Sequence, residues 1–112
     1  MISDELRFSV LRLLQSNPDI SQRDLAREVG VSLGKINYCL RALIEKGWVK
    51  ARNFKNSNNK IAYTYYLTPK GVSEKARMAY EFLSLKLREI EELRREIEHV
   101  RNERAGSLPE GG

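Results

Sequence analysis

The fold of this chain is decided by one stretch, which begins at Ser21, ends at Val49 and reads SQRDLAREVGVSLGKINYCLRALIEKGWV. Ser21 is a favourable cap for a helix, and Gly30 suits the left-handed position at which a helix ends. Ser32 can cap a second helix, which ends at Gly47 before an apolar strand. Two short helices joined by a tight turn and followed by a strand indicate a helix-turn-helix with a wing. This pattern predicts a protein that places a helix in the major groove of DNA.

Apolar residues at helical spacing indicate which face each helix buries. A first helix is expected over residues 4–16 with Ser3 as its cap, a second over 22–29 and a third over 32–46. The predicted core residues of these helices are Leu6, Val10, Leu13, Leu14, Leu25, Val29, Ile36, Leu40, Leu43 and Ile44.

Two segments rich in aromatic and β-branched residues, 48–54 and 61–67, predict a strand pair with a polar tip at 55–60. Thr68 and Pro69 are well suited to start a helix, and no proline interrupts the chain from there to Arg104. The predicted fold is therefore mainly α with a small β-wing (α+β). Its parts are a winged helix-turn-helix domain over 1–68, a long C-terminal helix over 69–104 and a disordered tail over 105–112.

The net positive charge of the chain comes entirely from its first part. The formal net charge is +5, and the residues before Pro69 include eleven Lys or Arg against six Asp or Glu. From Pro69 onward there are nine of each sign. A basic excess confined to the helix-turn-helix predicts a polyanionic partner, and we expect it to be double-stranded DNA.

Three groups of side chains are expected to contact DNA. On the third helix, Asn37 can pair with adenine, and Arg41 or Lys35 can reach guanine or phosphate. The start of the second helix is placed for phosphate contacts, and the wing can reach the backbone and the minor groove. The candidates are Ser21, Gln22, Arg23, Ser32, Leu33, Gly34, Lys35, Asn37, Tyr38, Arg41, Arg52, Lys55, Asn58 and Lys60. Any one of them could equally be an ordinary solvated residue, and the agreement of helix order, caps and charge favours an interface.

The final helix carries a heptad pattern that Lys86 interrupts, with Leu87 beside it able to take its place. The predicted dimerisation residues are Leu83, Leu87, Ile90, Leu93, Ile97 and Val100. Acidic residues occupy the g positions and basic residues the e positions, which favours a parallel homodimer: Glu89, Glu96, Arg94 and Arg101. The alternative is a helix that packs back on its own winged domain through Ala76, Ala79, Tyr80 and Phe82.

The stretch from Ile20 to Phe54 resembles the MarR-type winged-helix regulators of bacteria, and most closely their exopolysaccharide-associated (EPS-associated) branch. The run Ser-Leu-Gly-Lys-Ile-Asn-Tyr at 32–38 is its most specific part, and Leu-Thr-Pro-Lys-Gly at 67–71 extends it. The family's wing usually carries an Asp and Arg pattern, which residues 55–60 replace. The resemblance covers about residues 1–104. It implies a dimeric transcription factor acting on promoters near polysaccharide-biosynthesis genes, and it identifies no small-molecule effector.

Nothing in the sequence indicates an enzyme. No nucleophile–base pair, phosphate loop or metal-ligand cluster is present, so no catalytic site, metal site or cofactor is expected. Cys39 is expected to be a packed thiol rather than a redox switch, and His99 a solvated residue. No apolar run approaches the roughly 20 residues of a membrane span, and Asp4 and Glu5 do not suit a signal peptide. A cytoplasmic protein without membrane contact is therefore expected.

These features favour a sequence-specific, homodimeric transcriptional regulator that occupies an inverted-repeat operator. Two other functions stay open. The winged helix could be a docking module of a protein-interaction adaptor, with the long helix as its oligomerisation element. The chain could also coat nucleic acid without sequence preference, in which case specific and scrambled duplexes bind equally at low salt.

Overall fold

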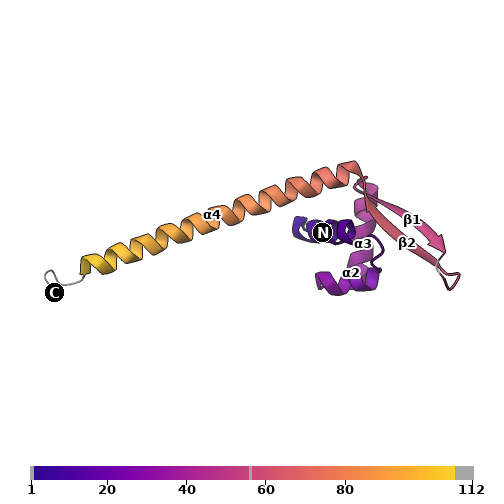
Figure 1. Ribbon diagram of the computed structural model, residues 1–112, viewed down its shortest axis with the longest axis horizontal. Coiled ribbons are helices and arrows are strands. Elements are labelled where there is room, and N and C mark those ends of the chain that lie inside the picture. Colours follow the sequence, from indigo (N-terminus) through magenta and orange to yellow (C-terminus); the bar gives the residue numbers. More distant parts are fainter. Residues whose placement is uncertain (1, 56, 108–112) are drawn as a thin grey trace. The chain divides into compact units, whose positions relative to one another are not determined.

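The computed structural model describes residues 2–55 and 57–107, whose elements follow one another as expected (Figure 1). They are α1 (Asp4–Ser16), α2 (Gln22–Val29), α3 (Leu33–Glu45), β1 (Val49–Lys55), β2 (Ile61–Leu67) and α4 (Pro69–Ser107). The mainly α fold with a two-stranded wing is confirmed. The chain forms one compact unit up to Ala79 and a second from Tyr80 onward. Because α4 continues to Ser107, residues 105–107 are helical, and 108–112 of the expected tail lie outside the described residues.

Serine caps begin the first three helices. The hydroxyl oxygens of Ser3, Ser21 and Ser32 each accept a hydrogen bond from the backbone N–H three residues later, at 3.0–3.1 Å. Each such cap contributes about 1 kcal/mol, because it satisfies an N–H that has no partner within the helix. Gly30 ends α2 at a φ of +82°, the left-handed conformation that glycine adopts without strain. The tight turn between α2 and α3 is therefore encoded locally.

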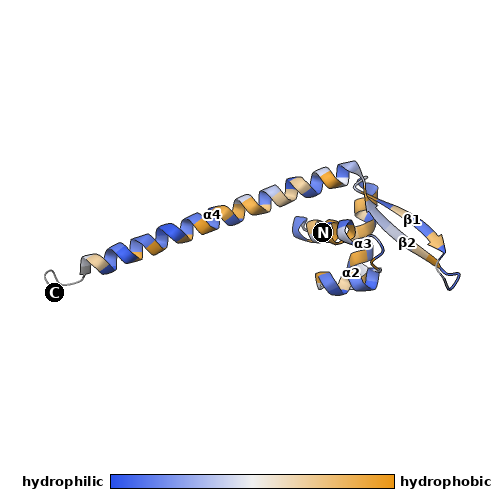
Figure 2. Ribbon diagram, viewed as in Figure 1, coloured by the Kyte–Doolittle hydropathy of each residue, from blue (hydrophilic) through white to orange (hydrophobic). Residues whose placement is uncertain are grey.

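The core of the first unit lies between α1, α2 and α3. Val10, Leu14, Ile36 and Leu43 are fully buried, and Leu25 is 1% exposed. Figure 2 shows hydrophobic residues spaced along these helices at intervals, with hydrophilic residues between them. This core fixes the orientation of α3, whose other face is left to solvent.

The expected core needs three corrections. Ile44 is 38% exposed, because the buried arc of α3 extends from the Ile36 row toward Cys39 and leaves Ile44 beyond its opposite edge. Leu13 is only half-buried, since α1 is turned so that Leu11 enters the core in its place. Val29, at the last turn of α2, is also half-buried.

The wing is an antiparallel pair whose register extends from Val49 opposite Leu67 to Lys55 opposite Ile61. It projects away from the three helices (Figure 1). β2 is attached to the loop before α2 by two hydrogen bonds. The Tyr65 N–H donates to the Pro18 carbonyl at 3.3 Å, and the Thr64 hydroxyl to Asp19 at 3.2 Å.

The start of α4 is packed tightly against the start of the wing. The Thr68 N–H donates to the Trp48 carbonyl at 3.0 Å, and the Thr68 hydroxyl oxygen accepts the Gly71 N–H at 3.1 Å. A Cβ at Gly71 would lie 1.9 Å from the Trp48 carbonyl oxygen, so this close approach requires glycine. Further along, Met78 is fully buried and anchors the first part of α4 in the first unit. Among the described residues, no helix has the length and apolar character to cross a membrane.

Candidate nucleic-acid interface

One face of α3 is exposed and polar while the opposite face is buried. Asn37 and Arg41 lie on the exposed face with Gly34, and Lys35 flanks it in the first turn. Tyr38 is 61% exposed. All seven candidates on this helix and its cap are exposed: Ser32, Leu33, Gly34, Lys35, Asn37, Tyr38 and Arg41. The helical period places donors and acceptors where a groove edge could meet them.

At the start of α2, Gln22 takes part in bonds that have no signal in the sequence. Its Nε2 donates to the Tyr65 hydroxyl at 2.9 Å, and its Oε1 accepts from Asn37 Nδ2 at 3.4 Å. Gln22 is half-buried, whereas Ser21 and Arg23 are exposed. Tyr65 is not among the residues predicted from the sequence, because 43 residues separate it from Gln22 and only the folded chain brings them together.

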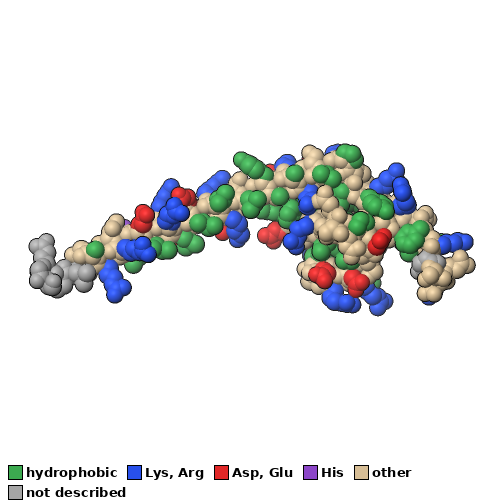
Figure 3. All heavy atoms as spheres, in the orientation of Figure 1, with side chains coloured by type: hydrophobic (Ala, Val, Ile, Leu, Met, Phe, Trp, Pro, Cys, Tyr) green, Lys and Arg blue, Asp and Glu red, His purple; other side chains and the backbone are tan. Residues whose placement is uncertain are grey.

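The candidates in the wing are also exposed. Arg52 lies on β1 with its guanidinium carbon 5.6 Å from the centre of the Tyr66 ring, and Lys55 ends this strand. Asn58 and Lys60 belong to the tip. Figure 3 shows Lys and Arg side chains around the wing and around α2. The same wing exposes large apolar side chains, namely Phe54, Ile61, Tyr63 and Tyr66.

Several bases of the first unit are available to bind an anion. Asp4 forms an ion pair with Arg7 at 3.0 Å, and Asp24 forms one with Arg27 at 3.2 Å. No ion pair joins Arg23, Lys35 or Arg41 to another described residue. These exposed cations could neutralise phosphates without first breaking a bond inside the protein.

Cys39 lies behind this surface, on the buried side of α3. It is fully buried, and burial raises the pKa of its thiol to about 11, against a smaller opposing effect of the Arg7 charge. The thiol therefore stays protonated and inaccessible at neutral pH, as expected for a packed residue. Within the described part of the chain, no group of three or more His, Cys, Asp or Glu residues could hold a metal ion.

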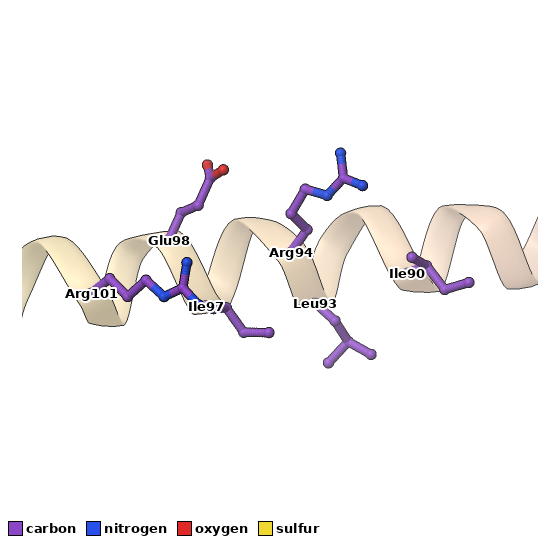
Figure 4. A pocket seen from close by; sticks show the side chains of 6 residues that line it. All are labelled: Ile90, Leu93, Arg94, Ile97, Glu98 and Arg101. Carbon is purple, nitrogen blue, oxygen red and sulfur yellow. The ribbon is translucent and has the colours of Figure 1, made fainter.

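The second unit has an apolar stripe along α4. The six predicted dimerisation residues are each more than half exposed: Leu83, Leu87, Ile90, Leu93, Ile97 and Val100. Figure 4 shows side chains that line a pocket on this helix, with Leu93 projecting on one side and Arg94 and Glu98 on the other. His99 is exposed, and its Nε2 lies 3.1 Å from Oε1 of Glu103, one helical turn away.

The three-helix core, the tight turn and the hairpin define the class of protein: the first unit is a winged helix-turn-helix. Residues 3–50 match the family model described as winged helix-turn-helix DNA-binding. No curated protein matches the sequence.

Solved structures share the fold over most of the chain. One is a MarR family protein of Mycobacterium tuberculosis in complex with p-aminosalicylic acid (24% identity, TM-score 0.61, 91% of this chain and 78% of that chain). Another is a mutant of MepR from S. aureus (16% identity, TM-score 0.64, 96% and 81%). A third is FabT of Streptococcus pneumoniae in complex with DNA (20% identity, TM-score 0.56, 90% and 72%). At these identities the similarity establishes the fold.

Proposed function

We propose that the chain is a sequence-specific transcriptional regulator of the MarR type that binds an inverted-repeat operator as a homodimer. Genes for polysaccharide biosynthesis are the expected targets, on the resemblance to the EPS-associated branch. The observation that carries the proposal is the exposed surface of α3, the second helix of the helix-turn-helix. It presents Lys35, Asn37 and Arg41 to solvent, while the opposite face of α3 is buried. The structural similarity to FabT of Streptococcus pneumoniae, which was solved in complex with DNA, supports it.

Each contact element has its own role in this proposal. Asn37 and Arg41 read base edges in the major groove, where amide and guanidinium groups can each make two hydrogen bonds to a purine. Ser21 and Arg23, at the start of α2, contact phosphate and fix the register of the protein on the duplex. The wing lysines, Lys55 and Lys60, neutralise the backbone beside the site.

The stripe on α4 is the proposed dimer contact. Six large apolar side chains are exposed on this one helix, and burying them against another molecule is favourable. A second copy of the chain supplies a matching heptad seam. The charges beside the seam favour the parallel orientation, in which Glu89 and Glu96 face Arg94 and Arg101 of the other copy. Each exposed pair contributes only about 0.5 kcal/mol, so the apolar seam supplies the affinity and the charges select the orientation.

The test is a selection on the organism's own DNA. The full chain is mixed with sheared genomic DNA at about 150 mM salt, and the retained fragments are sequenced. We expect enrichment of a two-fold-symmetric site with half-sites about one helical turn, roughly 34 Å, or a multiple of it apart. Retention without enrichment would instead indicate a nucleic-acid-coating protein.

One observation favours a second candidate, the protein-interaction adaptor. Phe54, Ile61 and Tyr63 of the wing are 44–64% exposed and could be covered by a protein partner. An adaptor would bind duplex DNA without a steep salt dependence. Arg41→Ala or Lys35→Ala would then leave retention on DNA unchanged.

A further inference from the structure

We propose that Tyr65 and Gln22 are positioning residues for Asn37, so that the wing strand β2 contributes to base discrimination through side chains behind the DNA surface. The inference rests on the proposed function, because it assigns Asn37 to base reading. It adds a dependence of specificity on a tyrosine that lies outside the reading helix.

The side chains form a chain of hydrogen bonds from the core to the surface. Tyr65 is 7% exposed, Gln22 is half-buried and Asn37 is exposed. The Tyr65 hydroxyl accepts from Gln22 Nε2 at 2.9 Å, and Gln22 Oε1 accepts from Asn37 Nδ2 at 3.4 Å. Both ends of the Gln22 amide are thus engaged within the protein, so its main role is to hold Asn37 rather than to contact phosphate.

The buried end of this chain is fixed by its backbone. The Tyr65 N–H donates to the Pro18 carbonyl, and the neighbouring Thr64 hydroxyl donates to Asp19. Both acceptors belong to the loop that leads into α2. Because β2 is fastened to this loop, the Tyr65 hydroxyl has a defined position relative to the first turn of α2. A rigid anchor of this kind lowers the entropy that an exposed amide loses when it binds.

The bond to Gln22 leaves Asn37 able to read adenine. An asparagine amide has two N–H donors and one carbonyl acceptor. Asn37 gives one donor to Gln22, so the second donor and the carbonyl oxygen remain for N7 and N6 of adenine in the major groove. The side chain is therefore held ready for the two-bond contact before DNA arrives.

The experiment uses a duplex that the full chain selects from a random-sequence library, together with a panel in which each base pair of that duplex is replaced in turn. Asn37→Ala identifies the base pair that Asn37 reads. We expect Tyr65→Phe to lower discrimination at that base pair about fivefold, the effect of losing one net hydrogen bond. Binding to a scrambled duplex should stay unchanged. Unchanged discrimination, or an equal loss at every base pair, would overturn the inference.

Tyr63→Phe is the matched control. Tyr63 lies on the same strand, is 54% exposed, and its ring stacks on that of Tyr65 at a centroid distance of 6.4 Å. Loss of its hydroxyl should leave the discrimination profile as it is. A double variant separates positioning from mere destabilisation: in a Gln22→Ala background, Tyr65→Phe should have no further effect. Effects that add independently would overturn the proposed chain of contacts.

A measurement without DNA separates this inference from the proposed function. In the free protein, the side-chain amide signals of Gln22 and Asn37 in ¹⁵N–¹H spectra should both shift in Tyr65→Phe and stay in place in Tyr63→Phe. If the chain selects a duplex but the Asn37 signal does not move, the inference fails and the proposed function stands. If the chain selects no duplex, the proposed function fails and the inference with it.

Discussion

Asn37 and Arg41 share the exposed face of α3 but differ from the wing lysines in the kind of contact they can make. Removing a side chain that contacts a base weakens binding only to the correct sequence. Removing one that contacts phosphate weakens binding to every sequence. We expect Asn37→Ala and Arg41→Ala each to weaken specific binding by about 1–3 kcal/mol and non-specific binding by much less. Titration of a selected and a scrambled duplex measures both. An equal loss on the two duplexes would refute base reading.

Gly71 is confined by the backbone next to it. A Cβ there would lie 1.9 Å from the Trp48 carbonyl oxygen, and neither backbone segment can move away cheaply. We expect Gly71→Ala to lower the free energy of unfolding by about 1–3 kcal/mol, the usual effect of an overpacked site. Urea denaturation measures it.

Gly106 is the control for this substitution. It lies in α4, and a Cβ added there would meet nothing within 4 Å, so Gly106→Ala should be neutral or slightly stabilising, as alanine is in an exposed helix. If both variants lose the same stability, the contact with Trp48 is not the cause.

At the scale of elements, the exposed lysines of the wing are expected to act through charge alone. Lys55→Ala and Lys60→Ala should weaken binding to all duplexes alike, and each should reduce the slope of log affinity against log salt by about 1. The control is Lys70→Ala, which removes an exposed lysine from the first turn of α4 and should leave that slope unchanged. A loss restricted to the selected duplex would show that the wing reads sequence instead.

The elements themselves can be predicted from the sequence because their signals are local. Serine caps, Gly30 and the helical spacing of apolar residues locate α1, α2 and α3, and β-branched and aromatic residues locate the wing. The face that each helix buries is predicted less well. Ile44 and Leu13 lie at the edges of apolar arcs, and only the packing partners decide which edge is covered.

The candidate site shows the same division. The exposure of the seven candidates on α3 and its cap follows from the helical period and could be predicted from the sequence, whereas the exposure of Ile44 could not. The bonds of Gln22 to Tyr65 and Asn37 join three elements and have no signature in the sequence, because side chains that meet across a fold carry no fixed spacing along the chain.

For the whole molecule, the proposed dimer depends on the stripe of the second unit. Ile97→Lys should convert the protein to a monomer, because a charge in the seam must be desolvated on association. Sedimentation velocity measures the change, and operator affinity should fall with it. Glu92→Lys places the same side chain off the stripe and should leave the dimer intact. A dimer that survives Ile97→Lys would show that the copies associate through another surface.

Cys39 is the only cysteine of the chain, and it lies on the buried side of α3, the helix proposed to face DNA. Because its thiol is inaccessible and keeps a pKa of about 11, a disulfide reagent can modify it only after α3 has moved away from the core. The rate of modification therefore measures how often α3 opens locally, and the measurement needs no added label. We expect slow modification at pH 8, still slower on a selected duplex, and fast modification in urea. If the native protein reacts as fast as the unfolded one, α3 is not held in place as described.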